Sequence, residues 1–368
     1  MNIENLREMT WKEKRNLAET TNDMQLLIEL AGDSSAHVRK EVLQREDAPI
    51  EAITNVYSKA STSQERKNVI HALYRAKPTD TLRNLLSQMV LDADDFISIE
   101  AIRMYRNKFK TIGLTAENCW RLETETDPTY LDNWAIMLPG FDEQSQLADN
   151  PNITGELAHK FVMALFCCER SLYSIQKCLY KVLSHPGILD RTIQYIRDRE
   201  SSRNYADEFY MNPKNALSSC TTCSSDQLNE LMNEYQSDVN KYVKEDWLLS
   251  VLVEFFDKFF SSLICNPNCT KETFDKAFNL FIKKFRLEWT NTLRMISECS
   301  HLADEQLLYM LQSHPGKCLM FSFIPERVAN LSENDLSAII ANISVSSKNW
   351  IMQFAKNIPE SLAIRLAV

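Results

Sequence analysis

The chain has 368 residues, of which 44% are hydrophobic and 25% charged, and its formal net charge is −9. This composition excludes a disordered or collagen-like chain. The six glycines are too far apart for phosphate-binding loops or for the GxSxG turn of a hydrolase. The N-terminus is polar and ten cysteines follow without an apolar leader, so we expect a cytoplasmic protein with reduced thiols.

Apolar residues recur with helical spacing near both ends of the chain. Met24, Leu27, Ile28 and Ala31 follow the i, i+3, i+4, i+7 pattern of an amphipathic helix, and residues 336–343 repeat it. The breaks between such segments begin with Asn, Ser, Asp or Thr and continue with an acidic residue, which is typical of helix N-caps. These patterns predict an all-α chain.

Residues 26–57 read LLIELAGDSSAHVRKEVLQREDAPIEAITNVY, and this segment resembles a variant leucine-rich repeat. This family is related to HEAT repeats, and its short helices alternate around small polar turns. The residues that carry the resemblance are Ala31, Asp33, His37, Val38, Arg39, Val42, Pro49, Ile50 and Glu51. Fainter versions occur at 147–166, 263–282 and 328–366. The resemblance implies an α-solenoid of stacked short helices and carries over no functional residues, because packing defines the family.

Two of the breaks are nearly identical. Residues 150–156 read NPNITGE and residues 266–272 read NPNCTKE, so Asn, Pro, Asn, Thr and Glu recur in register. We expect Thr154 and Thr270 to cap the helices that follow. Such self-similarity is typical of stacked helical units that cannot bury their apolar faces alone.

A polar stretch rich in Ser and Asn, residues 201–226, interrupts the helical pattern. We expect a seam or loop there, between N-terminal helical repeats in 1–200 and C-terminal helical repeats in 227–368, unless the repeats form one continuous solenoid. The most apolar stretch, 247–264, contains three charged residues. It is too short and too charged to span a membrane and predicts a buried core helix.

The cysteine and histidine patterns give little sign of catalysis or metal binding. Cys220 and Cys223 form a CxxC pair, but Cys265 and Cys269 follow at a spacing that is unusual for zinc. We interpret Cys220 and Cys223 as turn residues, with metal or thiol chemistry as the alternative. Ser-His-Pro-Gly occurs at 184–187 and 313–316, which favours a repeated turn over an active site. We predict no catalytic, cofactor or metal site.

Acidic residues are concentrated between 111 and 160, where nine acids face two bases, Arg121 and Lys160. Carboxylates beside aromatic rings suit ion pairs and cation–π contacts with Lys or Arg of a partner. The predicted partner-binding residues are Trp120, Glu123, Glu125, Asp127, Tyr130, Asp132 and Trp134. In the alternative interpretation the tryptophans belong to the core and the acids lie in first helical turns, where the helix dipole favours them.

These observations favour a non-enzymatic scaffold or adaptor that binds a protein partner, with a basic surface, through its solenoid. The alternative is a nucleic-acid-binding or DNA base-processing protein on the same fold, since Arg103, Arg106, Lys108 and Lys110 form a basic run. The sequence pI near 5.4 argues against nucleic acid. We expect neither a membrane span nor a small-molecule substrate.

Overall fold

The computed structural model describes residues 6–109, 122–137, 141–168, 171–200, 212–242, 246–284 and 299–313, together with 293, 295 and 296. Its regular structure is helical, and no strand occurs in these ranges, which confirms the predicted all-α class. The chain divides into two compact units, Met1–Cys178 and Leu179–Val368. The division falls inside a helix, α12 (Leu172–Val182), and not within the predicted seam.

Short helices follow one another in the first unit. They are α1 (Trp11–Thr20), α2 (Met24–Ala31), α3 (Ala36–Gln44), α4 (Ile50–Lys59), α5 (Ser63–Leu73), α6 (Asp80–Met89), α7 (Asp95–Lys108), α9 (Pro128–Met137), α10 (Phe141–Asp149) and α11 (Gly155–Cys168).

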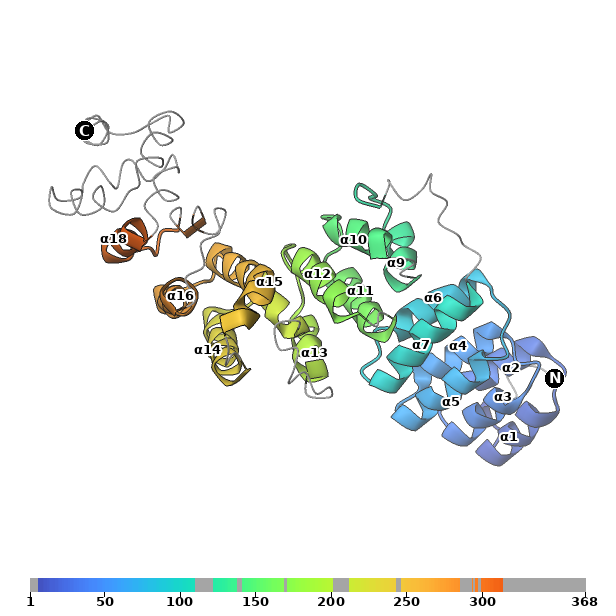
Figure 1. The fold of residues 1–368 in the computed structure, drawn as a ribbon. Helices are drawn as coiled ribbons and strands as arrows, with labels where there is room; N and C mark the ends of the chain where they lie inside the picture. Colours follow the sequence, from blue (N-terminus) through green and yellow to red (C-terminus); the bar gives the residue numbers. More distant parts are fainter. Residues whose placement is uncertain are drawn as a thin grey trace, which may run out of the picture. The chain divides into compact units, whose positions relative to one another are not determined.

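The first seven helices pack in two layers (Figure 1). In the first layer α1 contacts α3, α3 contacts α5, and α5 contacts α7. In the second layer α2 contacts α4, and α4 contacts α6. Later in the unit, α9 and α11 pack on each other and on α7. Each helix is therefore held mainly by its neighbours along the stack.

Polar N-caps begin most of these helices. Thr10 and Glu13 form a reciprocal capping box at α1, with the Thr10 amide 2.8 Å from Oε2 of Glu13. Asp23, Thr62, Thr79 and Asp94 cap α2, α5, α6 and α7. The breaks in the sequence thus mark helix starts, as predicted.

The buried face of α2 differs from the predicted stripe. Leu26, Leu27, Leu30 and Ala31 are buried, whereas Met24 is exposed. Because α2 packs against both α3 and α4, its apolar face is turned and widened relative to a single-sided amphipathic helix.

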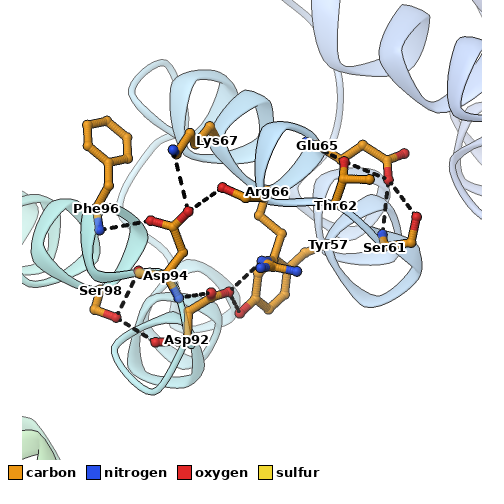
Figure 2. A network of polar contacts seen from close by, with 11 residues as sticks. Tyr57, Ser61, Thr62, Glu65, Arg66, Lys67, Asp92, Asp94, Phe96 and Ser98 are labelled. Carbon is orange, nitrogen blue, oxygen red and sulfur yellow. Dashed lines mark hydrogen bonds and ion pairs between the residues drawn. The ribbon is translucent and has the colours of Figure 1, made fainter.

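Basic side chains join successive first-layer helices at their N-terminal ends. The fourth residue of α1, α3 and α5 is basic in each case, and it reaches an acid at the start of the next helix of the layer. The pairs are Lys14 with Asp33 (2.9 Å), Arg39 with Glu65, and Arg66 with Asp92 (3.1 Å). Figure 2 shows the third junction, where Tyr57 also donates a 2.8 Å hydrogen bond to Asp92.

The C-terminal ends of the same helices are joined in a similar way. The last carbonyls of a helix lack partners within that helix. Here a guanidinium or ammonium group from the end of the next helix of the layer donates to them. Arg45 donates to the carbonyls of Ala18, Glu19 and Thr21 at the end of α1, Arg75 to those of Leu43 and Gln44 at the end of α3, and Lys108 to those of Tyr74 and Ala76 just after α5.

The second unit has longer helices and an aromatic core. After the end of α12 it contains α13 (Asp190–Glu200), the 3-10 helix η3 (Pro213–Ser219), α14 (Ser225–Tyr242), α15 (Asp246–Cys265), α16 (Lys271–Phe278), the π-helical η4 (Asn279–Lys284) and α18 (Asp304–Ser313). Tyr235 stacks on Phe259 with ring centroids 3.8 Å apart, and Phe256 and Phe281 pack around them.

The predicted core helix over 247–264 is α15, and Phe256, Phe259, Phe260 and Leu263 on it are fully buried. Searching the described residues for membrane-spanning candidates finds no helix that is both long and apolar enough. The tetrapeptide at 184–187 is a turn, as predicted, and Gly187 adopts a left-handed conformation there (φ 77°). Its second copy lies largely outside the described residues.

The predicted seam is described only from residue 212 onward. There η3 is almost entirely buried and packs against α13, α14 and α15. This half of the stretch is a compact turn within the second unit, and residues 201–211 lie outside the described ranges.

Candidate interaction surface

The predicted acidic stretch forms the turn that leads into α9. Glu123 and Asp127 are exposed, and Glu125 and Tyr130 are half-buried. Trp120 lies outside the described residues. Between 122 and 160 the sequence has eight acidic residues and one basic residue, Lys160, so the segment has a strong negative charge.

Hydrogen bonds within the turn hold these carboxylates in place. Oε1 of Glu125 accepts from the amides of Thr126 (2.9 Å) and Asp127 (3.0 Å). Oδ1 of Asp127 accepts from the Thr129 amide at 2.9 Å and so caps the first turn of α9. Because Asp and Glu are stabilised at a helix N-terminus, the turn can present its charges without folding them inward.

The first copy of the repeated NPN sequence, residues 150–152, holds the backbone of this turn. Nδ2 of the buried Asn150 donates to the carbonyls of Leu122 (2.6 Å) and Glu125 (2.9 Å). Nδ2 of Asn152 donates to the Glu125 carbonyl as well, at 3.1 Å. The Ala158 amide donates to the Thr154 carbonyl, which places Thr154 at the start of α11 as expected.

The second NPN copy also holds a turn through its two asparagine amides, in the second unit. Nδ2 of Asn266 donates to the carbonyls of Ser218 (3.0 Å) and Cys220 (2.8 Å). Nδ2 of Asn268 donates to the carbonyls of Thr221 and Cys223, at 2.9 Å each. Thr270 caps α16 through the Thr273 amide, which confirms that prediction. The motif is therefore a device that fastens one turn to another.

Asp132 is withdrawn from the predicted surface. Its carboxylate bonds to Ser87 of α6 and to Lys160 of α11, while Nζ of Lys160 lies 2.6 Å from Oγ of Ser87. Ser87 and Lys160 are buried. Since Asp132 neutralises Lys160 inside the unit, it joins three helices and has little capacity left for a partner.

Trp134 also belongs to the core. Its exposed fraction is 4%, and its ring contacts that of Tyr130 at 5.8 Å between centroids. The ion pair of Asp132 and the burial of Trp134 therefore remove these two residues from the predicted partner-binding surface. The residues that remain at the surface are Glu123, Glu125, Asp127 and Tyr130, which we call the acidic turn.

Cys220 and Cys223 lie buried in the turn between η3 and α14. A hydrogen bond between the two thiols lowers the pKa of Cys220 and raises that of Cys223. Among the residues whose positions are described, no group of three or more His, Cys, Asp or Glu side chains could hold a metal ion. Asn266 and Asn268 bind the backbone carbonyls of Cys220 and Cys223 and not the thiols.

Two members of the basic run near residue 106 are engaged within the protein. Lys108 bonds to the carbonyls after α5, and Arg103 pairs with Glu100 at 2.7 Å. Lys110 lies outside the described residues. The roles of Lys14, Arg39 and Arg66 were not predicted, although each stands four residues after an N-cap position, at Thr10, Ser35 and Thr62. That shared register was the available signal.

No protein-family model, curated protein or solved structure matches this chain.

Proposed function

We propose that the chain is a non-enzymatic scaffold, an α-solenoid of stacked short helices that binds a protein partner with a basic surface. Support for the solenoid comes from the alternate packing of α1–α7 and from junctions that recur at both ends of the first-layer helices. Helical stacks of this kind offer long continuous surfaces for binding.

The acidic turn carries the proposal for the partner. It places the exposed carboxylates of Glu123 and Asp127 beside the half-buried ring of Tyr130, within a segment of strong negative charge. The Asn150 clamp fixes the backbone of the turn, so that binding orders few additional groups. Rim carboxylates of this kind raise the association rate with a basic partner.

A nucleic-acid partner has less support. In the α1–α7 stack, acids neutralise Lys14, Arg39, Arg66 and Lys67, while Arg75 and Lys108 donate to carbonyl groups. Counterion release from phosphates requires bases that remain free to neutralise them.

The test uses the full chain as bait for proteins of the native host, with Glu123→Gln and Asp127→Asn combined. Asn keeps a side-chain oxygen that can cap α9, so the melting temperature should fall by less than about 2 °C. Captured partner should fall at least about tenfold, and its retention should lose most of its salt dependence. The matched control is Glu29→Gln with Glu51→Gln on the second layer. Equal capture by both double variants would contradict the proposal.

A further inference from the structure

The turn between η3 and α14 brings the thiols of Cys220 and Cys223 together. The Cys223 amide donates to the Cys220 carbonyl at 3.2 Å, and a turn closed in this way holds its first and last Cα atoms within about 7 Å of each other. A disulfide usually joins Cα atoms that are about 4.4 to 6.8 Å apart. Both cysteines are free thiols in the structure, and a hydrogen bond joins them. The backbone of the turn is therefore already shaped for a disulfide.

The two thiols have different surroundings. Sγ of Cys220 accepts hydrogen bonds from the Cys223 thiol and from the amides of Thr222 and Cys223, and Oγ1 of Thr222 lies 3.3 Å away. The bond from the Cys223 thiol is the largest influence that lowers the pKa of Cys220, and burial opposes it. The same bond and burial raise the pKa of Cys223. Because the thiolate is the reactive form of cysteine, Cys220 is the nucleophile of the pair.

Backbone contacts hold the pair in place without using its sulfur atoms. Asn266 and Asn268 bind the carbonyls of Ser218, Cys220, Thr221 and Cys223. The hydroxyls of Thr221 and Thr222 donate to the carbonyls of His185 (3.4 Å) and Ile188 (3.0 Å). These bonds can remain when the sulfur atoms react, so the thiols are pre-organised and the fold does not depend on their oxidation state.

The pair lies just beneath the surface. Both thiols are buried, but Thr222 and Ser224, on either side of Cys223, are exposed. A small uncharged molecule can therefore reach the thiols through a local opening of the turn. Zinc requires further side-chain ligands, and within the described ranges no third His, Cys, Asp or Glu completes a metal site with this pair.

From this geometry we infer that Cys220 and Cys223 are a redox-active pair, which a small hydroperoxide oxidises to a disulfide. The Cys220 thiolate attacks one peroxide oxygen, the O–O bond breaks and hydroxide leaves, so that Cys220 becomes a sulfenic acid and the peroxide is reduced by two electrons. The Cys223 sulfur then attacks the sulfenic sulfur, the S–O bond breaks, and the oxygen leaves as water with the Cys223 proton. A dithiol reductant restores both thiols by exchange.

Cys269 provides a contrast within the same unit. It is also buried, and its thiol donates to the Thr270 carbonyl at 3.6 Å. Burial raises the pKa of Cys269 to about 12, with smaller contributions from nearby Cys299 and Cys265. Its thiolate is therefore scarce near pH 7, and we expect Cys269 to react slowly with peroxide.

The test treats the reduced full chain with hydrogen peroxide, alkylates the remaining thiols and maps the peptides by mass spectrometry. The Cys220–Cys223 disulfide should form at least about tenfold faster than Cys269 is oxidised, and dithiothreitol should reverse it. Cys223→Ser should stop at a sulfenic acid on Cys220, which dimedone traps. Cys220→Ser should slow the oxidation of Cys223 at least about tenfold. The matched control, Cys269→Ser, should change the rate of disulfide formation by less than about twofold.

Three outcomes would overturn the inference: oxidation of Cys220 no faster than that of Cys269, a disulfide from Cys220 to a cysteine other than Cys223, or a Cys220–Cys223 disulfide that forms only after unfolding in urea. Circular dichroism of each variant checks the fold. If Cys220→Ser does not fold, the unsubstituted chain and Cys223→Ser still decide between these outcomes. The test does not involve the acidic turn, so its result is independent of the proposed partner there.

Discussion

The α1–α7 stack and residues 212–284 solve the same packing problem with different chemistry. In the stack, long basic side chains reach across to acids and to helix-terminal carbonyls. In residues 212–284, the short side chain of the buried Asn266 donates to the carbonyls of another turn, and aromatic rings fill the core. Charged junctions depend on protonation and amide junctions do not, so the two regions should respond differently to substitution and to pH.

The largest effect should come from the aromatic core of the second unit. Phe259→Ala removes a fully buried ring stacked on Tyr235, and we expect it to cost about 3 to 5 kcal/mol. Guanidinium unfolding followed by circular dichroism measures the loss. A cost below about 1 kcal/mol would mean that the cluster is loosely packed.

The asparagine clamps should come next. Asn266→Ala and Asn150→Ala each remove two hydrogen bonds from a buried amide to backbone carbonyls, with an expected cost of about 2 to 3 kcal/mol. Asn84→Ala, at an exposed position of α6, is the matched control and should change stability by less than about 0.5 kcal/mol. If all three variants unfold alike, the NPN motif does not fasten the turns.

The stability lost on removing a basic junction residue should depend on how deeply that residue is buried. Arg39 is almost fully buried, pairs with Glu65 and donates to the carbonyls of Asp33 (2.7 Å) and Ser34 (2.9 Å). We expect Arg39→Met to cost about 2 kcal/mol, because it leaves a half-buried carboxylate and two carbonyls unpaired. Arg15 is half exposed and pairs with Glu41, so solvent screens this pair and Arg15→Met should cost about 0.5 kcal/mol or less. Thermal unfolding of both variants gives the comparison, which would fail if their effects were equal.

At Asp257 we expect a modest gain in stability instead of a loss. Burial raises the pKa of Asp257 to about 6, and nearby Lys258 only partly opposes this. Its Oδ1 has no hydrogen-bond partner. Asp257→Asn should therefore stabilise the protein by about 1 kcal/mol at pH 7. Near pH 4 the native carboxyl is already protonated, so the variant should gain nothing there. Melting curves at both pH values check this, and destabilisation at pH 7 would contradict it.

Features set by neighbouring residues could be predicted from the sequence. Thr270 as a cap, α15 as a core helix and the turn at Gly187 each depend on a few adjacent residues. Trp134 and Asp132 could not be placed in this way. Asp132 is held by Ser87 of α6 and Lys160 of α11, with Lys160 lying 28 residues from Asp132 and 73 from Ser87. Trp134 is buried on α9, a helix that packs on α6, α7 and α11. A pattern of acids and aromatic rings looks the same whether its residues face a partner or another helix.

Hydrogen exchange of the full chain as a function of pH tests most directly whether the two regions are joined by different chemistry. Burial raises the pKa of Glu65, but hydrogen bonds from Arg39 and Ser61 lower it by more, so the net shift is downward. The pKa of Asp94 is also lowered, mainly by a hydrogen bond from the Ser63 hydroxyl. Carboxylates with lowered pKa values stabilise the native state above their unfolded pKa near about 4, and this stability is lost as the pH falls further. Asp257, with its raised pKa, has the opposite sign.

After correction for intrinsic exchange rates, protection in α15 should therefore rise between about pH 7 and pH 5, while protection in α1–α7 should stay constant and fall only below about pH 4. Protection that changes in the same direction and over the same pH range in both regions would contradict this account.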